Sequence, residues 1–299
     1  YVILDLIFIK QIGVFNFLLR GLIVKLRRKI KKNNFEYKTL SGKNYNIYNW
    51  DPSGAEVFLT QCFTDWGNEY LFLDSLKDRK KGIFLDIGCH SGYYSILFDH
   101  YFHKIIGFEP SSKCIEILSD LKSKKFHAYQ LFVGDEDMEV KSKEYPNGYS
   151  FYGDTSTGKD FKIKNLLQIS LDNFCQKENL NNITAIKIDV DGIDLKVLYG
   201  AYNLINSNRP SIMIENYSKE LFQFFNDKKY SIFTLTSDKK KPYNLELEEM
   251  SEHNPAKWVK MVCCIPNEYK KSYNRKIFKG NFFTGINKKR ILKTFNAYF

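Results

Sequence analysis

Short apolar runs that end in glycine or an acid alternate with helical segments from about Gly82 onward. This alternation is typical of β-α-β units, in which helices cover a mostly parallel sheet. Further apolar runs at 230–235 and 258–265 would close that sheet. We therefore expect an α/β fold, with strands at 83–87, 104–108, 126–133, 183–190 and 211–214 and helices at 93–100, 112–122, 195–205 and 219–226.

The pattern changes at both ends of the chain and in one internal segment. Residues 1–50 form an apolar and basic extension that we expect to be helical, and residues 271–299 form a basic C-terminal extension. Between them, residues 51–270 form the main domain, with a glycine-rich, aromatic insertion near 136–170 that predicts a hairpin beside a site.

The N-terminal extension does not predict a membrane span. Asp5, Lys10 and Arg20 interrupt its apolar residues, so no run of about 18 uncharged residues exists. A basic cluster at 25–32 follows. The extension could lie in a membrane interface or could pack on the domain or on a second subunit.

Charge is unevenly distributed along the chain. Residues 1–50 carry ten Lys/Arg and two acids, and residues 251–299 carry eleven and two, whereas residues 51–250 carry 24 basic and 30 acidic groups. The acidic body disfavours a nucleic-acid groove, and the basic ends suit a membrane surface, an acidic glycan, RNA or plain solvation. The six cysteines have neither CxxC nor zinc spacing, which indicates reduced thiols and a cytoplasmic protein. A peripheral position at the inner face of a membrane is the alternative location.

A candidate ligand-binding turn follows the first expected strand. Gly88 and Gly92 lie in a D-x-G-x-x-x-G pattern that begins at Asp86, which allows a sharp turn and a close approach of ligand to backbone. Glu109 ends the second strand, about 20 residues later, where an acid accepts hydrogen bonds from ribose hydroxyls. Asp135, after the third strand, is a candidate acceptor for an adenine amine or a simple turn residue.

These motifs, with others further along, resemble the FkbM family of methyltransferases. The resemblance runs from about Gly82 to Glu215 and includes Gly107-Phe108-Glu109-Pro110, Val133-Gly134-Asp135, Ser170-Leu171-Asp172-Asn173-Phe174 and Ile186-Lys187-Ile188-Asp189-Val190-Asp191-Gly192-Ile193-Asp194. Two positions depart from the family pattern: His90 stands where the family usually has Asn, and Asp191 where it usually has Glu.

The resemblance implies a class I methyltransferase fold, with a Rossmann-like, mostly parallel sheet, an antiparallel edge strand and here an N-terminal helical extension. It also implies S-adenosyl-L-methionine as cofactor and a sugar, glycolipid or polysaccharide hydroxyl as acceptor. The predicted cofactor-binding residues are Asp86, Gly88, His90, Gly92, Glu109 and Asp135.

The catalytic candidates follow the strands at the carboxyl edge of the sheet, where ligands of open α/β sheets bind. Asp189 is the predicted general base for the acceptor hydroxyl. Glu215 is the second candidate, and Lys187 on the same strand face as Asp189 either pairs with an acid or touches substrate. Asp189, Asp191 and Glu215 are hard oxygen ligands, but they are not a ligand set by themselves, so no metal is expected.

Two other functions stay open at this stage. Asp189, Lys196 and Glu215 with the basic ends could serve an RNA ribose methyltransferase. A cofactor-binding scaffold without activity is the other alternative. For a sugar acceptor, Tyr149, Phe151 and Tyr152 are candidate stacking surfaces. The sequence does not indicate an oligomeric state.

Overall fold

The computed structural model describes residues 12–30, 34–39, 41–61, 64–77, 79–121, 123–146, 150–152 and 160–272. They fall into two compact units. Unit 1 combines the residues before position 79 with those after position 216, and unit 2 comprises residues 79–216. Each unit is described by itself below.

Five parallel strands form the centre of unit 2. Their order is β11-β10-β3-β4-β5, with β3 at Ile83–Ile87, β4 at Lys104–Phe108, β5 at Phe126–Tyr129, β10 at Ile183–Ile188 and β11 at Ser211–Ile214. Numbered along the chain, this is the doubly wound order 3-2-1-4-5. The predicted α/β class with a Rossmann-like sheet is therefore confirmed. The order reverses between β3 and β10, and this switch point is where such sheets bind ligands.

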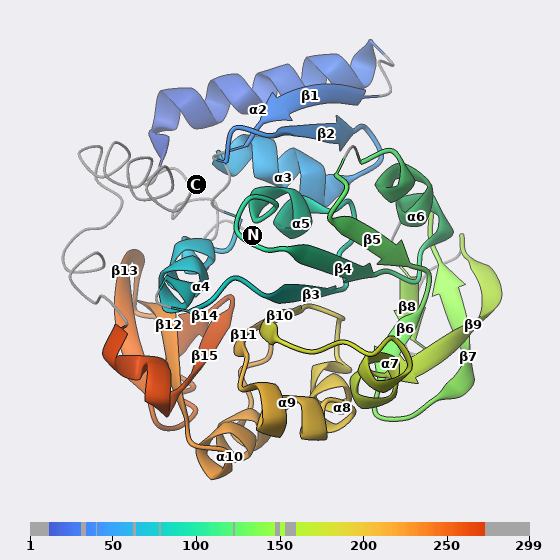
Figure 1. Ribbon diagram of the computed structural model, residues 1–299. Helices are drawn as coiled ribbons and strands as arrows, with labels where there is room; N and C mark the ends of the chain where they lie inside the picture. Colours follow the sequence, from blue (N-terminus) through green and yellow to red (C-terminus); the bar gives the residue numbers. More distant parts are fainter. Residues whose placement is uncertain are drawn as a thin grey trace. The chain divides into compact units, whose positions relative to one another are not determined.

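Helices lie on both faces of this sheet, with α5 on one face and α8 and α9 on the other (Figure 1). The apolar faces of the strands are buried against them, as in the stack of Phe84 on Phe102 with ring centroids 5.1 Å apart. The helices are α5 (Tyr93–Leu97), α6 (Ser112–Ser119), α7 (Leu171–Lys177), α8 (Asp194–Tyr199) and α9 (Tyr202–Asn208).

The single helix expected at 195–205 is wrong, because α8 ends at Tyr199, with Gly200 as its C-cap, and α9 begins at Tyr202. A Cβ on Gly200 would lie 1.9 Å from the Gly134 carbonyl oxygen, so the chain bends where it meets another strand. Asp172 then accepts hydrogen bonds from the N–H groups of Asn203 (2.9 Å) and Leu204 (2.8 Å), which caps α9.

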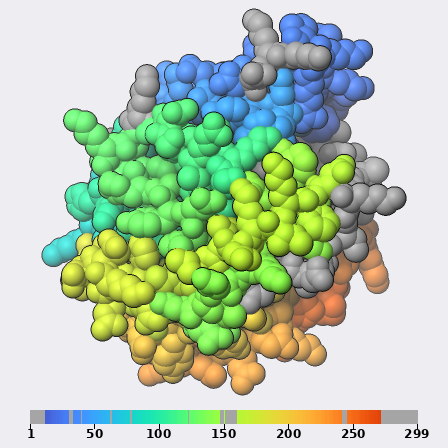
Figure 2. Space-filling view, turned by 90° about the vertical axis from the view of Figure 1, so that its right-hand side faces the viewer, coloured from blue at the N-terminus to red at the C-terminus, as the bar shows by residue number. Residues whose placement is uncertain are grey.

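The strand expected at 126–133 is also divided. β5 ends at Tyr129, and β6 (Phe132–Gly134) pairs instead with β9 in a second sheet of order β6-β9-β7-β8. In this sheet β7 (Met138–Glu144) pairs antiparallel with β9 (Lys162–Ser170) and with β8 (Ser150–Tyr152). The yellow-green segment of the chain, which includes β9, lies on the face that Figure 2 presents.

Unit 1 contains helices from both of the chain segments that form it, together with antiparallel strands. The extension expected to be helical has helix α2 (Val14–Lys29) and, after it, a hairpin of β1 (Asn34–Lys38) and β2 (Asn44–Tyr48). The strand expected at 258–265 is broken into β14 (Lys257–Val259) and β15 (Val262–Pro266). Both pair antiparallel with β12 (Tyr230–Asp238), β14 near its end and β15 near its start. The other elements are α3 (Pro52–Thr60), α4 (Asn68–Leu76), α10 (Lys219–Asp227), β13 (Lys241–Met250) and the 3-10 turn η1 (Asn267–Ser272).

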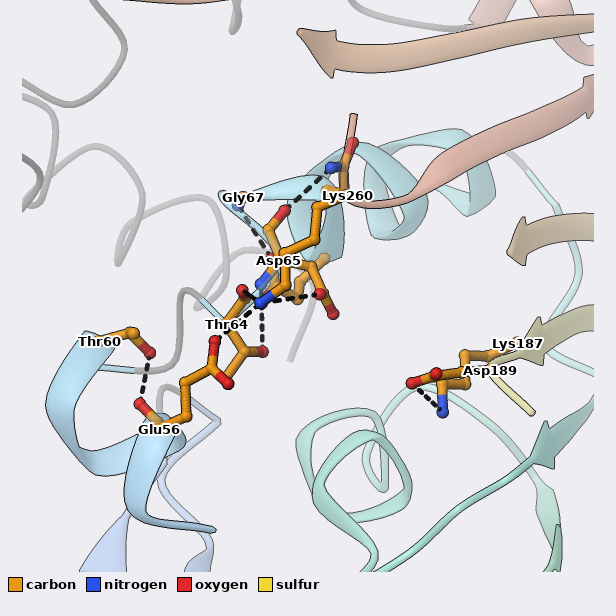
Figure 3. A network of polar contacts seen from close by, with 10 residues as sticks. Glu56, Thr60, Thr64, Asp65, Gly67, Lys187, Asp189 and Lys260 are labelled. Atoms are coloured by element: carbon orange, nitrogen blue, oxygen red, sulfur yellow. Dashed lines mark hydrogen bonds and ion pairs between the residues drawn. The ribbon is translucent and has the colours of Figure 1, made fainter. Parts of the chain in front are cut away.

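A buried polar cluster holds the loop before α4 in unit 1 (Figure 3). The Glu69 carboxylate accepts hydrogen bonds from the Thr64 hydroxyl and from the N–H groups of Asp65 and Gly67, each at 3.0 Å. Lys260 lies beside it, with Nζ 2.7 Å from Glu56 Oε1. Burial, with repulsion from Asp65 as the second cause, raises the pKa of Glu69 to about 7.

The raised pKa of Glu69 predicts a pH-dependent stability. Folded protein keeps Glu69 protonated up to about pH 7, whereas the unfolded chain releases this proton at the ordinary pKa of 4.5. The protonated carboxyl therefore stabilises the folded state at low pH, and this stabilisation is lost as the pH rises from 4.5 through 7. Between pH 5 and pH 8 the free energy of unfolding should fall by about 2–3 kcal/mol on account of Glu69. In Glu69→Gln this part of the decline should vanish, as measured by urea unfolding at both pH values.

Glu116→Gln, at an exposed carboxylate on α6, is the control and should keep the wild-type pH dependence. An unchanged decline in Glu69→Gln would show that another group causes it.

Candidate functional site

The turn after β3 is shaped by two glycines. Gly88 has φ +72° and donates its N–H to the Phe108 carbonyl oxygen at 2.9 Å. A Cβ at Gly88 would lie 1.9 Å from the Asp189 carbonyl oxygen. Gly92, with φ +80°, closes the turn through a 2.7 Å hydrogen bond to the Cys89 carbonyl and begins α5. The loops after β3 and β10 therefore touch through their backbones at the switch point of the sheet.

Glu109 joins this turn to the end of β4. Its Oε2 accepts the His90 N–H at 2.9 Å and its Oε1 accepts the Ser111 N–H at 2.9 Å. The side chain is 5% exposed, and burial raises its pKa, although His90 and the hydrogen bonds from Ser111 and His90 oppose the shift. Each oxygen keeps a lone pair that can accept from a further donor.

Two of the predicted acids, Asp189 and Glu215, follow strands at the carboxyl edge of the sheet. The N–H of Asp189 donates to the Ile87 carbonyl at 3.2 Å, and the N–H of Glu215 donates to the Ile188 carbonyl at 3.1 Å. Each residue thus begins its loop directly beyond the last carbonyl of the neighbouring strand. Asp189 and Glu215 follow adjacent parallel strands in register, so they lie at the same level of the sheet.

Lys187 is the centre of the charged groups at this edge (Figure 3). Its Nζ lies 2.9 Å from the Gly88 carbonyl oxygen, 3.1 Å from Asp189 Oδ2 and 3.8 Å from Asp86 Oδ1. The side chain is 3% exposed, and Nζ also lies 5.4 Å from the ring centre of Tyr94. Of the two roles considered from the sequence, the structure favours pairing with acids.

Asp86 lies entirely inside unit 2. Its Oδ2 accepts the Ser95 hydroxyl at 2.6 Å, and it faces Lys187 as the register partner of that residue on β10. Burial raises the pKa of Asp86, while the Lys187 ammonium and the Ser95 hydroxyl oppose the shift. A residue so enclosed supports the loop from beneath, whereas Asp189 has 38% of its side chain exposed and Glu215 is also exposed.

Asp135 and His90 lie apart from this pattern. Because β5 ends at Tyr129, Asp135 follows β6 in the second sheet rather than a strand of the parallel sheet, and its side chain is exposed. His90 has φ +46° and contributes its backbone N–H to Glu109, while Nδ1 lies 3.3 Å from Ser91 Oγ. The roles predicted for them toward a cofactor stay predictions.

Sequence patterns did not indicate several of the residues that hold the site. Ser95 on α5 contacts Asp86, and no motif marks it. Glu144 of β7 accepts hydrogen bonds from the Ser112 hydroxyl at 2.8 Å and the Lys113 N–H at 3.4 Å. It thereby caps α6 from a strand more than thirty residues away, next to the Ser111 N–H that Glu109 holds.

No group of three or more His, Cys, Asp or Glu side chains in the part of the chain that the structure describes is arranged to hold a metal ion.

The parallel sheet and its carboxyl-edge loops define the chain as a Rossmann-like α/β protein. The family model described as Methyltransferase FkbM domain matches residues 54–232, which is more than half of the chain. The chain therefore belongs to the FkbM methyltransferase family. The match includes the glycine turn, Glu109, Asp189 and Glu215.

Several solved structures are similar to this chain. The methyltransferase FkbM from Methylobacillus flagellatus KT is 16% identical with a TM-score of 0.40, and the match covers 71% of this chain and 54% of that one. A precorrin-6y C5,15-methyltransferase from Geobacter metallireducens GS-15 is 12% identical with a TM-score of 0.37, covering 66% and 88%. An rRNA methylase from Streptococcus thermophilus is 11% identical with a TM-score of 0.35, covering 66% and 94%. A comparison with curated proteins gave no match.

The contact of Gly88 with Asp189 predicts a large effect of one methyl group. Gly88→Ala adds strain at positive φ, about 1–2 kcal/mol, and a clash with the Asp189 carbonyl, about 1–3 kcal/mol more. Gly192→Ala is the matched control, since Gly192 also has positive φ (+94°) but has no atom within 4 Å of its Cβ position. Urea unfolding should show the larger loss for Gly88→Ala. Equal losses would mean that the close approach is not a constraint.

Proposed function

We propose that this protein is an S-adenosylmethionine-dependent O-methyltransferase that acts on a hydroxyl of a sugar, glycolipid or polysaccharide, with Asp189 as the general base. The observation that carries the proposal is the Lys187–Asp189 pair at the switch point of the sheet. It presents one partly exposed carboxylate beside the glycine turn, with its orientation held by a buried ammonium group.

The residues around the turn fit the cofactor. A side chain at Gly88 would clash with the Asp189 carbonyl oxygen, so the turn has no side chain at this position. A ligand can therefore approach the backbone of the turn closely. Glu109 has lone pairs left for the two ribose hydroxyls after accepting from His90 and Ser111. The surrounding acids, Asp86, Asp189 and Asp191, suit a ligand that carries positive charge on its sulfonium and amino groups.

The proposed chemistry needs little from the protein beyond alignment and removal of a proton. When bound, S-adenosylmethionine supplies an electrophilic methyl group. Asp189 accepts the proton of the acceptor hydroxyl, which becomes acidic as its oxygen receives the methyl group. Lys187 is a positioning residue, because it holds the Asp189 carboxylate at 3.1 Å and is itself fixed by the Gly88 carbonyl. Glu215, exposed at the same level of the next strand, orients the acceptor.

A hydroxyl-rich acceptor suits the exposed acids Asp189 and Glu215, which can accept hydrogen bonds from several hydroxyl groups. The same acids would repel the phosphates of RNA, and the excess of acids over bases in residues 51–250 adds to that repulsion. Of the aromatic residues proposed for stacking, Tyr149 lies outside the described residues, as do the side chains of Phe151 and Tyr152.

We also propose a cytoplasmic site of action. The five cysteines in the part of the chain that the structure describes are free and buried, and burial raises the pKa of the Cys89, Cys263 and Cys264 thiols well above the ordinary value. Such thiols are unreactive and fit a reducing compartment.

Cofactor binding tests the first half of the proposal. Isothermal titration of S-adenosylmethionine into the wild-type protein should show saturable binding. Glu109→Ala should raise Kd by about 10–100-fold, since it removes charge-assisted hydrogen bonds to the ribose. Glu109→Gln, which keeps one acceptor oxygen, should fall between the two. Absence of heat with folded wild-type protein, checked by thermal unfolding, would refute the cofactor assignment.

Substitution of Asp189 tests the second half. Asp189→Asn keeps the shape of the side chain and should lower kcat by about 100-fold or more, with Kd for S-adenosylmethionine changed by only a few-fold. Transfer of a tritiated methyl group to cell-envelope glycans, with RNA as a parallel acceptor, is the measurement. Asp120→Asn, at the exposed residue directly after α6, is the control. A wild-type rate in Asp189→Asn would move the base elsewhere, with Glu215→Gln as the next variant. Label in RNA alone would overturn the acceptor class.

A further inference from the structure

Helix α2 is firmly attached to unit 1 through one of its faces. Phe17 packs against Trp66, which is 1% exposed, and Val24 is buried. The Arg20 guanidinium donates to the Phe58 carbonyl at 2.7 Å and lies 4.5 Å from the centre of the Phe58 ring. Arg27 lies over the ring of Phe35 at 4.3 Å. These contacts fix the helix on α3 and on the β1–β2 hairpin, so its other face has a fixed orientation.

The other face of α2 is an exposed apolar stripe. Its residues recur every four positions or lie next to one that does, so they share one side of the helix. Phe15 is 76% exposed, Leu18 63% and Leu22 53%. Single exposed apolar side chains are common on protein surfaces, but a contiguous group of them indicates an interaction site. The stripe consists of Val14, Phe15, Leu18, Leu19, Leu22 and Leu26, with Ile30 at the end of the helix.

Positive charge accompanies the C-terminal half of the stripe. Lys25 and Lys29 continue the same side of the helix, and Arg28 lies next to them. Residues 14–29 contain no acid, and no ion pair involves these three residues within the described part of the chain. Long basic side chains at the edge of an apolar face can extend their charges to a lipid headgroup while their carbon chains stay on the apolar surface.

We propose that α2 binds the surface of an anionic lipid bilayer, with the stripe in the headgroup region and Lys25, Arg28 and Lys29 on lipid phosphates. No described helix is long and apolar enough to cross a membrane, so α2 lies parallel to the bilayer plane. An amphipathic helix with apolar and basic residues on its exposed side combines the two interactions that such binding requires.

A second copy of the chain fits this stripe poorly. In an antiparallel two-fold pairing, Lys25 and Lys29 of each copy would face Val14 and Leu18 of the other, which buries ammonium groups without a carboxylate. In a parallel pairing the basic ends would repel each other. An anionic bilayer neutralises the same charges.

Co-sedimentation of the full chain with vesicles tests this proposal, which does not depend on methyl transfer. The wild type should bind vesicles of phosphatidylcholine with phosphatidylglycerol more tightly than vesicles of phosphatidylcholine alone, and added salt should weaken that preference. Leu18→Glu with Leu22→Glu should lower the partition coefficient on both vesicles by roughly tenfold or more. Lys25→Gln with Lys29→Gln should lower it roughly 25-fold on anionic vesicles alone, at about fivefold per lysine.

The matched control places the same change on another exposed apolar surface. Ile163 and Leu167 of β9 are 64% and 57% exposed, and Ile163→Glu with Leu167→Glu should bind vesicles as the wild type does. Thermal unfolding checks that all variants are folded. Failure of the wild type to bind anionic vesicles would overturn the proposal, as would equal binding by the Leu18/Leu22 variant. A wild-type dimer that this variant converts to monomer, without vesicle binding, would assign the stripe to a second copy.

Discussion

A buried ammonium group between carboxylates determines the arrangement of the candidate site. Removing Lys187 from water costs several kcal/mol, and the structure offsets this with oxygen partners from three positions, Asp86, Gly88 and Asp189. The first is set by strand register, since Lys187 and Asp86 are partners on adjacent strands β10 and β3. The third is the residue that emerges from the sheet two positions later. The orientation of Asp189 is therefore a consequence of sheet register rather than of a mobile loop.

The backbone imposes a second constraint on the same place. Gly88 approaches the Asp189 carbonyl so closely that no side chain fits, and Gly107 has the Cys89 sulfur 2.8 Å from where its Cβ would be. The turn after β3 therefore lies against the loop after β10 at Gly88 and against strand β4 at Gly107. Glu109 completes the arrangement, because its carboxylate accepts hydrogen bonds from the His90 N–H in the turn after β3 and from the Ser111 N–H directly before α6. The glycines bring the loops together, and the charged residues determine which groups remain exposed there.

The sequence was sufficient for the parallel strands and for the acids at their ends. Runs such as 83–87 are apolar, short and followed by glycine, and the parallel arrangement brings their ends to one edge of the sheet. The sequence was not sufficient where one continuous apolar run forms two strands that pair with different neighbours. The apolar run 126–133 continues through Leu131 and Phe132, yet β5 pairs with β4 and β6 pairs with β9. The supporting contacts of Ser95 and Glu144 depend on distant segments, which no local pattern encodes.

The uneven distribution of charge along the chain matches the ligands proposed for its two sites. Acids outnumber bases in residues 51–250, where the candidate site concentrates Asp86, Glu109, Asp189 and Glu215. A cationic ligand is favoured by such a potential and a phosphate backbone is not. The N-terminal 50 residues have ten bases and two acids, and there the exposed side of α2 adds an apolar surface to positive charge. Positive charge alone would suit RNA as well as lipid, but an unpaired apolar stripe gains nothing from RNA phosphates and gains burial at a bilayer surface.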